Sequence, residues 1–423
     1  MKPGALSRRA LIKGAAALAA LRALRPLRLT AGIGDARPAG PRRKPLHVAV
    51  VGAGAFGGWT ALYLLRKGAR VTLIDAWGPG NSRASSGGET RVIRATYGPD
   101  RPYVQMVVRA LALWRENEVR WKRPLFRKTG VLWMAGPDDR YEKASLPLMR
   151  AAGLTIDAWS AAEAGTRFPQ VNFEGVSWVI HERDAGYLLA RRSCQEVLQG
   201  FLSEGGDYRQ REARPGAIQD GLLREILLSD GSRLVADRHV FACGPWLGAL
   251  FPDLLGERIT PTRQEVFFFG TPPGDPRFLE ERLPVWIDNG ARIFYGIPGS
   301  DGRGFKVADD TRGPTVDPTT QERMPTKAGL RAARGYMEFR FPGMQGAPLL
   351  ETRVCQYENS PDTRFIIDRH PRAGNLFIVG GGSGHGFKHG PAIGERVADL
   401  VLGAASPDPF FSLARLTLMN GGS

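Results

Sequence analysis

Cysteine and histidine are scarce in this chain, with three of the former and six of the latter among 423 residues. Three cysteines are an odd number, so they cannot all pair with one another in disulfides. For Cys194 and Cys243 we expect small buried side chains. The sequence also lacks a cluster of metal ligands, a Ser/His/Asp arrangement and internal repeats. It therefore predicts no metal centre and no hydrolytic triad.

Acidic residues are also in deficit, because 42 of them stand against 58 basic ones and the formal net charge is +16. Residues 1–44 hold eleven basic residues and one acid, so this segment alone contributes +10. The rest of the chain has no motif that combines basic and aromatic residues, so nucleic acid is not an expected partner. Beyond the first residues, no apolar run is long enough to predict a stable membrane span.

The first residues fit an export signal. Residues 7–13 read Ser-Arg-Arg-Ala-Leu-Ile-Lys, which is the order of groups in a twin-arginine signal, and a weakly apolar stretch follows over 14–21. Three arginines interrupt the apolar region soon afterwards. We expect a leader over 1–44 that the twin-arginine export machinery recognises, which makes the mature protein periplasmic or exported. A basic leader on a cytoplasmic protein is the alternative.

A nucleotide-binding pattern begins directly after this leader. The apolar run 47–51 leads into Gly52-Ala-Gly-Ala-Phe-Gly57, apolar residues at helical spacing follow, and a second apolar run, 70–74, ends at Asp75. The glycines permit a tight turn, close approach to a pyrophosphate and packing of the helix on the strand, while the acid can accept a ribose hydroxyl. Strand, helix, second strand and terminal acid together predict a dinucleotide site.

A second glycine-rich segment lies near the other end of the chain. Gly380-Gly-Gly-Ser-Gly-His-Gly-Phe-Lys-His-Gly390 follows the apolar run 376–379, and Pro391 then opens an amphipathic helix. Such a turn brings backbone N–H groups and a helix N-terminus towards a flat or anionic ligand. The polar, glycine-rich stretch 78–91 is suited to wrapping the same ligand. Because an NAD domain would usually continue with further βα units instead, these features favour FAD.

With these motifs the chain resembles the FAD-dependent amine oxidases of the D-amino-acid-oxidase-like class, and above all the monomeric sarcosine oxidase and N-methyltryptophan oxidase branch. The resemblance covers residues from about 47 to about 403. Its motifs are Gly52–Gly57 with Asp75, Thr90-Arg-Val-Ile-Arg94, Arg353-Val-Cys355 with Phe365-Ile-Ile-Asp368, and Gly384-His-Gly-Phe-Lys388. It implies an α/β fold in which a Rossmann-like FAD-binding domain is interleaved with a substrate domain built on a mixed, largely antiparallel sheet.

The resemblance implies how the cofactor is held. Cys355 matches the cysteine that bonds covalently to FAD through a thioether. The cofactor-binding residues implied in the same way are Gly52, Gly54, Phe56, Gly57, Asp75, Ser85, Ser86, Thr90, Arg91, Cys355, Gly384, Gly386, Phe387 and Lys388.

The resemblance also implies catalytic and substrate-binding roles. Arg94 and Lys388 match the pair of cations that binds the substrate carboxylate, which aims the α-carbon C–H at the flavin. Tyr295 matches a tyrosine of the substrate pocket. Lys306 matches the lysine that activates dioxygen, where a buried cation favours electron transfer, and Arg91 matches an arginine beside the flavin ring.

Three positions depart from this branch. Gly87 stands where it often has a histidine near the flavin, Asp310 stands where another pocket histidine would be, and Trp286 replaces a flexible methionine. Asp310 would attract the ammonium form of the substrate or pair with Lys306. Trp286 would narrow the pocket or offer an aromatic wall to a cation. The expected substrate class is therefore secondary amino acids in general, N-methylated or cyclic, rather than sarcosine in particular.

The length of the chain after the leader predicts two interleaved domains. The FAD-binding domain is predicted over 45–100, 171–258 and 345–405, the substrate domain over 101–170 and 259–344, and a C-terminal tail over 406–423.

Local patterns predict the elements of these domains. Apolar spacing predicts a helix over 104–119, and Asp230-Gly231 predicts a hairpin turn. Alternation and aromatic content predict sheet strands at 265–269 and 291–296. The polar, proline-rich stretch 301–323 is predicted as a surface loop or lid.

The function that these inferences support is an FAD-dependent oxidase acting on the C–N bond of a secondary amino acid. Its partners would be a small amine substrate and dioxygen, and we expect a monomer. One alternative is a dehydrogenase that passes electrons to a quinone or a partner protein. Another is a non-catalytic flavoprotein that assists the assembly of a larger complex, and a plain NAD oxidoreductase is the least favoured.

Overall fold

The computed structural model describes residues 44–418. Contacts divide the chain into residues 1–44 and a compact unit of residues 45–423. The predicted twin-arginine leader falls outside the described residues, except at Lys44, and stays a prediction. None of the helices in the described range has both the length and the apolar character that crossing a membrane requires.

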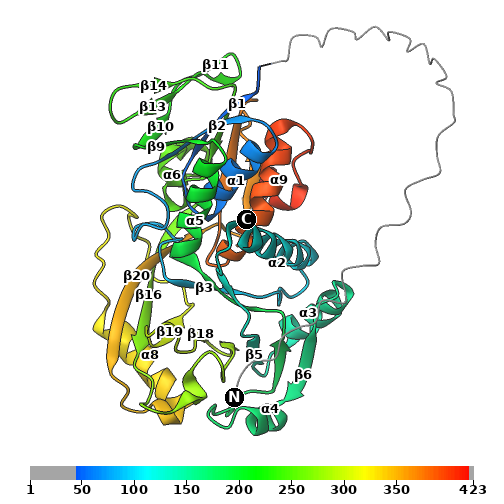
Figure 1. Ribbon diagram of the computed structural model, residues 1–423, viewed down its shortest axis with the longest axis vertical. Coiled ribbons are helices and arrows are strands. Elements are labelled where there is room, and N and C mark those ends of the chain that lie inside the picture. Colours follow the sequence, from blue (N-terminus) through cyan, green and yellow to red (C-terminus); the bar gives the residue numbers. More distant parts are fainter. Residues whose placement is uncertain (1–43, 419–423) are drawn as a thin grey trace, which may run out of the picture. The chain divides into compact units, whose positions relative to one another are not determined.

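A six-stranded sheet forms one half of the compact unit (Figure 1). Its order is β21 (Ile366–Arg369), β22 (Leu376–Gly380), β15 (Arg238–Phe241), β1 (His47–Val51), β2 (Arg70–Asp75) and β9 (Asp207–Gln210). All neighbours are parallel except β21 and β22, which are antiparallel. Because both faces of a parallel sheet are covered, strands such as β1 are buried along their whole length.

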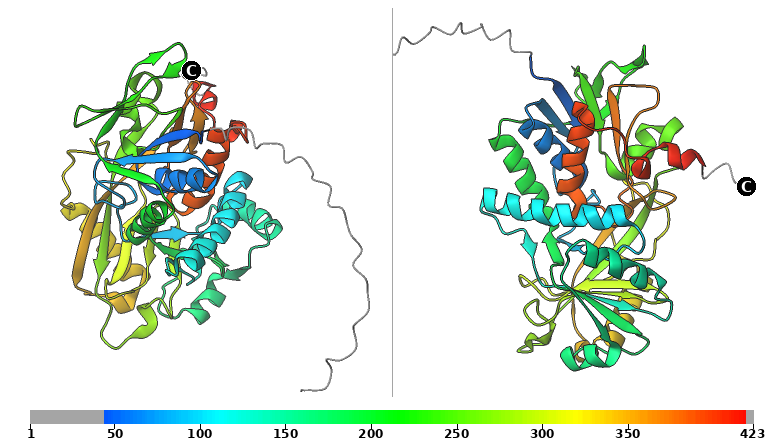
Figure 2. Two further views of the ribbon diagram at one scale, coloured as in Figure 1. Left: turned by 45° about the horizontal axis from the view of Figure 1, so that its top comes forward. Right: turned by 90° about the vertical axis from the view of Figure 1, so that its right-hand side faces the viewer.

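Helices cover this sheet and bring distant segments together. The helices concerned are α1 (Ala55–Arg66), α2 (Arg101–Trp121), α5 (Ala190–Ser203) and α9 (Gly390–Leu402). Helix α1 packs against α5 and α9, and α2 packs against α9 (Figure 2). The approach of α9 to α1 is close because a Cβ at Gly394 would lie 2.6 Å from the carbonyl carbon of Trp59. The α2 observed here confirms the helix predicted over 104–119.

An eight-stranded sheet forms the other half, seen below the first in Figure 1. Its order is β20 (Leu349–Asn359), β16 (Thr260–Phe269), β19 (Phe305–Asp309), β18 (Ile293–Ile297), β17 (Val285–Asn289), β5 (Val131–Ala135), β7 (Trp178–Glu182) and β6 (Ile156–Ser160). Only β17 and β5 run parallel, so the predicted mixed, largely antiparallel sheet is confirmed.

Smaller elements complete the described chain. Three short strands, β3 (Thr90–Ile93), β8 (Gly186–Leu189) and β4 (Phe126–Arg127), form a sheet of their own. The antiparallel pair β13 (Ile226–Leu228) and β14 (Arg233–Leu234) confirms the predicted hairpin, and β13 also pairs with β10 (Ala213–Pro215). The remaining strands and α-helices are β11 (Ile218–Gln219), β12 (Leu222–Leu223), α3 (Arg140–Ala151), α4 (Ala161–Arg167), α6 (Leu247–Leu250), α7 (Pro252–Leu255), α8 (Lys327–Arg340) and α10 (Ala414–Leu418).

The prediction of a surface loop or lid over 301–323 is wrong for its first part. Strand β19 occupies Phe305–Asp309 and lies between β16 and β18 in the large sheet. Phe305 and Val307 are fully buried in the apolar core, and Lys306 between them is 2% exposed. Because polar and proline-rich flanks dominate the composition of residues 301–323, the pattern of the five-residue strand is not recognised.

The predicted domain ranges stay a prediction, but two strands of the eight-stranded sheet pair across them. Strand β7 lies within 171–258 and β20 within 345–405, both assigned to the FAD-binding domain. Both strands pair in the eight-stranded sheet instead. Strand β20 therefore runs from the eight-stranded sheet towards the glycine-rich turn after β22.

We expect Gly394→Ala to destabilise the protein by about 1–3 kcal/mol, because the added methyl group pushes α9 away from the backbone of α1. Urea unfolding followed by circular dichroism measures the change. The matched control is Gly335→Ala on the exposed face of α8, where an added Cβ meets nothing within 4 Å. That control should be neutral or stabilising by up to about 1 kcal/mol. Equal effects of the two substitutions would contradict the packing argument.

Candidate active site

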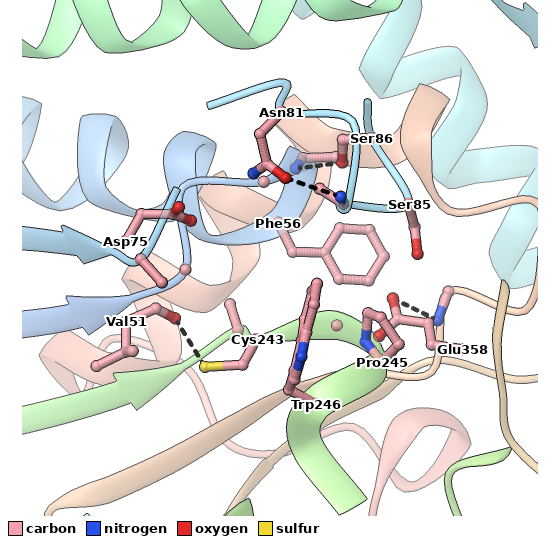
Figure 3. A pocket seen from close by; sticks show the side chains of 18 of the residues that line it. Val51, Phe56, Asp75, Asn81, Ser85, Ser86, Cys243, Pro245, Trp246 and Glu358 are labelled. Atoms are coloured by element: carbon pink, nitrogen blue, oxygen red, sulfur yellow. Dashed lines mark hydrogen bonds between the residues drawn. The ribbon is translucent and has the colours of Figure 1, made fainter. Parts of the chain in front are cut away.

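A cavity of about 340 Å³ opens at the carboxyl ends of the parallel strands β1, β2 and β15. Open parallel sheets bind ligands at this edge. Figure 3 shows Asp75 on one side of this cavity, Glu358 on the other, and the Phe56 ring between them. The predicted dinucleotide motif and the distant glycine-rich turn thus face the same space.

The turn after β1 shows why the sequence requires glycine here. Gly52 has a φ of +101°, and a Cβ at this position would lie 2.3 Å from the carbonyl oxygen of Ala242. The carboxylate of Asp75 fastens the turn, since it accepts hydrogen bonds from the backbone N–H groups of Ala53 and Gly78, both at 2.7 Å. Burial raises the pKa of Asp75 above its ordinary value, against the effect of these N–H groups.

The start of helix α1 and the 78–91 segment form the adjoining wall. The Ser86 hydroxyl accepts a hydrogen bond from the backbone N–H of Ala55 at 3.1 Å. The buried Ser85 hydroxyl has no hydrogen-bond partner among the described residues. A helix N-terminus, glycine walls and an unpartnered hydroxyl are what a pyrophosphate-containing ligand needs, so the cavity fits FAD.

Most of the predicted cofactor-binding residues line this cavity, namely Gly52, Gly54, Phe56, Asp75, Ser85, Ser86, Arg91, Gly384, Gly386 and Phe387. Gly57 lies behind the wall, where a Cβ would be 1.9 Å from the carbonyl oxygen of Gly52, so it permits the packing of α1. Thr90 and Cys355 lie outside the lining, and Lys388 lines a second cavity.

The second cavity, of about 900 Å³, adjoins the first. The two share Arg91, Tyr357, Gly384 and Phe387 in their walls. Among the predicted substrate-binding residues, Arg94, Lys388, Tyr295 and Asp310 line it. A ligand in the second cavity therefore lies next to a ligand that occupies the first cavity at the shared wall.

Two cations meet in the second cavity on one aromatic ring. The Arg94 guanidinium lies 4.5 Å and the Lys388 ammonium 5.3 Å from the ring centroid of Tyr97. Arg94 donates a hydrogen bond to the Thr96 carbonyl, and Lys388 donates one to the His385 carbonyl at 2.8 Å. Burial, and next the neighbouring Arg94, hold the pKa of Lys388 well below its ordinary value. An anion bound between them would relieve this repulsion.

Asp310 supplies a negative charge to the same cavity. Tyr357 donates a hydrogen bond from its hydroxyl to Asp310 Oδ1 at 2.6 Å. Burial raises the pKa of Asp310, while Tyr357, Arg94 and Lys388 act in the opposite direction. Lys306, the alternative partner of Asp310, instead donates a hydrogen bond to the Thr90 carbonyl at 3.2 Å.

Lys306 and Cys355 lie close to Arg91, which belongs to the wall that the two cavities share. Arg91 donates hydrogen bonds to the Ser85 carbonyl at 2.5 Å and the Thr90 carbonyl at 2.8 Å, and its guanidinium is 3.4 Å from Cys355 Sγ. Burial, and next Arg91, lower the pKa of Lys306 to about 7. Its ammonium is 5.2 Å from the ring centroid of Tyr295.

The prediction that Trp286 lines the substrate pocket is wrong. The ring of Trp286 is buried in the core, with centroids 5.9 Å from Phe305 and 5.0 Å from Phe341. Successive side chains of a strand point to opposite faces, so its neighbour Ile287 lines the cavity instead. Gly87 also leaves no room for a histidine, because a Cβ there would lie 1.9 Å from the Asn81 carbonyl oxygen.

Sequence reasoning missed Tyr357, Glu358 and Trp246, which also line the first cavity. Tyr357 follows Cys355 by two residues on β20, so strand alternation places both side chains on the same face and could have identified it. Trp246 lies beside Trp77, with ring centroids 5.0 Å apart and the rings tilted by 42°. No local pattern distinguishes Glu358 from a surface acid.

Comparisons with known proteins agree with this geometry. The family model described as FAD dependent oxidoreductase matches residues 47–400. The monomeric sarcosine oxidase of Arthrobacter sp. (strain TE1826) is 31% identical over 396 residues, covering 89% of this chain and 98% of the relative. The N-methyl-L-tryptophan oxidase of Salmonella arizonae is 29% identical over 362 residues, covering 84% of this chain and 94% of the relative.

Two solved structures share the fold. L-proline dehydrogenase from P. horikoshii has a TM-score of 0.78 at 19% identity, covering 89% of this chain and 99% of its own. Iminodiacetate oxidase from Chelativorans sp. BNC1 has a TM-score of 0.70 at 24% identity, covering 86% of this chain and 98% of its own. The family match over residues 47–400 and the 31%-identical relative, with a cavity that fits the cofactor, show that the chain belongs to the family of FAD-dependent oxidoreductases.

Proposed function

We propose that this protein oxidises the C–N bond of a secondary amino acid, N-methylated or cyclic, and reduces dioxygen to hydrogen peroxide. The observation that carries the proposal is the junction of the two cavities, with Arg94 and Lys388 in the second. FAD, when bound, supplies the acceptor for the electron pair and passes it to dioxygen. The names of the two relatives, a sarcosine oxidase and an N-methyl-L-tryptophan oxidase, support the same substrate class.

Arg94 and Lys388 bind the substrate carboxylate in this proposal. The guanidinium offers a planar pair of donors and the ammonium completes the neutralisation of charge. Because both cations rest on carbonyl oxygens, their positive charge stays available to an anionic ligand. A carboxylate held there fixes the α-carbon near the shared wall formed by Tyr357 and Gly384.

Asp310 then faces the amine. Its carboxylate lines the same cavity as the two cations, so a zwitterionic amino acid finds an acceptor for N–H as well as donors for its carboxylate. As the C–N bond becomes C=N, the amine loses a proton and the α-carbon loses a hydride equivalent. Water then hydrolyses the imine to an amine and a carbonyl group, which are separate products for an N-methyl substrate and parts of one ring-opened product for a cyclic substrate.

Lys306 and Cys355 act on the cofactor side of the junction. The ammonium of Lys306 places a positive charge where negative charge develops as dioxygen is reduced. Cys355 lies beside Arg91 and in this proposal would hold FAD through a thioether, as the matching cysteine does in the related branch.

Anaerobic titration of the holoprotein with a panel of N-methyl and cyclic amino acids tests the function. We expect the flavin absorbance to bleach with at least one member and to return, with one equivalent of hydrogen peroxide, when air is admitted. Bleaching without peroxide formation would instead identify a dehydrogenase. No bleaching with any member, with flavin demonstrably bound, would contradict the proposed amine chemistry.

The same titration tests the carboxylate site. In Arg94→Met, the substrate concentration that gives half-maximal reduction should rise by about 10²-fold, because one charged partner is lost in a buried site. The control is Arg109→Met, whose guanidinium is exposed and paired with Glu395 on the surface. An unchanged titration curve for Arg94→Met would remove this residue from the site.

We expect Lys306→Met to slow reoxidation of the reduced enzyme by dioxygen by about 10²-fold while leaving anaerobic reduction nearly unchanged. Stopped-flow absorbance measures both steps, and Lys128→Met at an exposed position is the control. An ammonium is charged below its pKa, so the wild-type rate should be highest at low pH. It should fall as the pH rises through about 7. An anion bound beside the ammonium raises the pKa of Lys306, and the fall in rate then occurs at higher pH.

A thioether to Cys355 predicts that acid-precipitated wild-type protein retains the flavin absorbance. Cys355→Ser should release FAD into the supernatant under the same conditions. Cys243→Ser removes a cysteine from the wall of the first cavity and should behave like the wild type. Release of FAD from the wild type would exclude the covalent bond.

A further inference from the structure

Glu358 is a buried acid in the wall of the first cavity. The sequence did not single it out among the cofactor contacts, and its carboxyl group is incompletely hydrogen-bonded within residues 44–418. It stands near the end of β20, directly after Tyr357, and is 7% exposed. Its backbone carbonyl accepts a hydrogen bond from the Ser383 N–H at 3.1 Å, which fixes the strand against the glycine-rich turn.

One oxygen of the carboxyl group is satisfied and the other is not. Oε1 accepts a hydrogen bond from the Gly382 N–H at 3.1 Å. Oε2 is buried and has no partner among the described residues. A buried acceptor without a donor costs free energy, so an orphan in the wall of a ligand cavity indicates a donor on the ligand.

Glycines shape the space around this carboxyl group. A Cβ at Gly244 would lie 3.3 Å, and one at Gly380 would lie 3.6 Å, from Glu358 Oε2. At Gly382 it would lie 2.8 Å from Oε1. Burial raises the pKa of Glu358 to about 7, with only backbone N–H groups acting in the opposite direction. The carboxyl group is therefore accommodated by the backbone but not neutralised by a cation.

The chemistry of the ligand limits what Oε2 can bind. Above its pKa of about 7 the carboxyl group is charged and repels phosphate oxygens, which carry negative charge and no proton. Hydroxyl groups are donors, and FAD carries them on the ribose of its adenosine half and on the ribityl chain next to the flavin. Asp75 stands at the carboxyl end of β2, where the ribose of a dinucleotide binds. Figure 3 shows Glu358 on the opposite side of Phe56 from Asp75.

We propose that Glu358 is a cofactor-binding residue whose Oε2 accepts a hydrogen bond from a hydroxyl group of the ribityl chain of FAD. The flavin end of the first cavity is the end that meets the second cavity, and Tyr357, the neighbour of Glu358, belongs to both walls. The inference rests on FAD binding by this family and not on the identity of the amine.

Binding measurements with two ligands test this role. The full-length chain carrying Cys355→Ser, freed of flavin, is titrated with FAD and separately with ADP, which contains the adenosine half without a ribityl chain. Adding Glu358→Leu should raise the dissociation constant for FAD by about tenfold or more. The constant for ADP should stay within about twofold, and protein fluorescence follows both titrations.

Two further variants keep the outcome decisive. Asp75 is the matched acid at the other end of the first cavity, and Asp75→Asn should weaken the binding of FAD and of ADP alike. Should Glu358→Leu fold poorly, Glu358→Ala removes the carboxyl group without adding bulk and should likewise weaken FAD binding selectively. FAD affinity unchanged by either Glu358 variant, or equal losses for FAD and ADP, would overturn the proposal. Because no amine is present, these results are independent of whether the protein oxidises secondary amino acids.

Discussion

The arrangement of this site depends on positive charges that are held by carbonyl oxygens. Lys306 and Lys388 are 2% and 4% exposed, and Arg91 and Arg94 are half-buried beside them. Their hydrogen bonds go to the carbonyls of Thr90, Thr96, Ser85 and His385. A carbonyl dipole positions a cation without cancelling its charge, so the site retains a positive potential that favours anionic ligands.

Strand β20 connects the first cavity and the second cavity into one site. It begins in the eight-stranded sheet and ends against the glycine-rich turn that follows β22. Along its last residues it brings Cys355 near Arg91, Tyr357 to the wall shared by both cavities and Glu358 to the cofactor cavity. Cofactor and substrate sites are therefore built on one rigid element, which limits their relative movement.

Much of the fold could be predicted because its determinants are local. Three glycines, two apolar runs and a terminal acid within 29 residues, 47–75, are sufficient to specify strand, turn, helix and strand. Strand β19 was missed because five residues with polar, proline-rich flanks give too short a pattern. Trp286 was misplaced because one step along a strand reverses the face, and only the pairing with β5 and β18 decides which face meets the cavity.

The sequence by itself determined the family resemblance, the cofactor class and which cations to consider, since each depends on residue types at short spacing. Only the tertiary structure decided which of these residues meet. Asp310 and Tyr357 lie 47 positions apart and share a hydrogen bond, whereas Lys306, four positions from Asp310, points to Thr90 instead. Such contacts follow from sheet pairing between distant segments, and no local pattern contains the register that produces them.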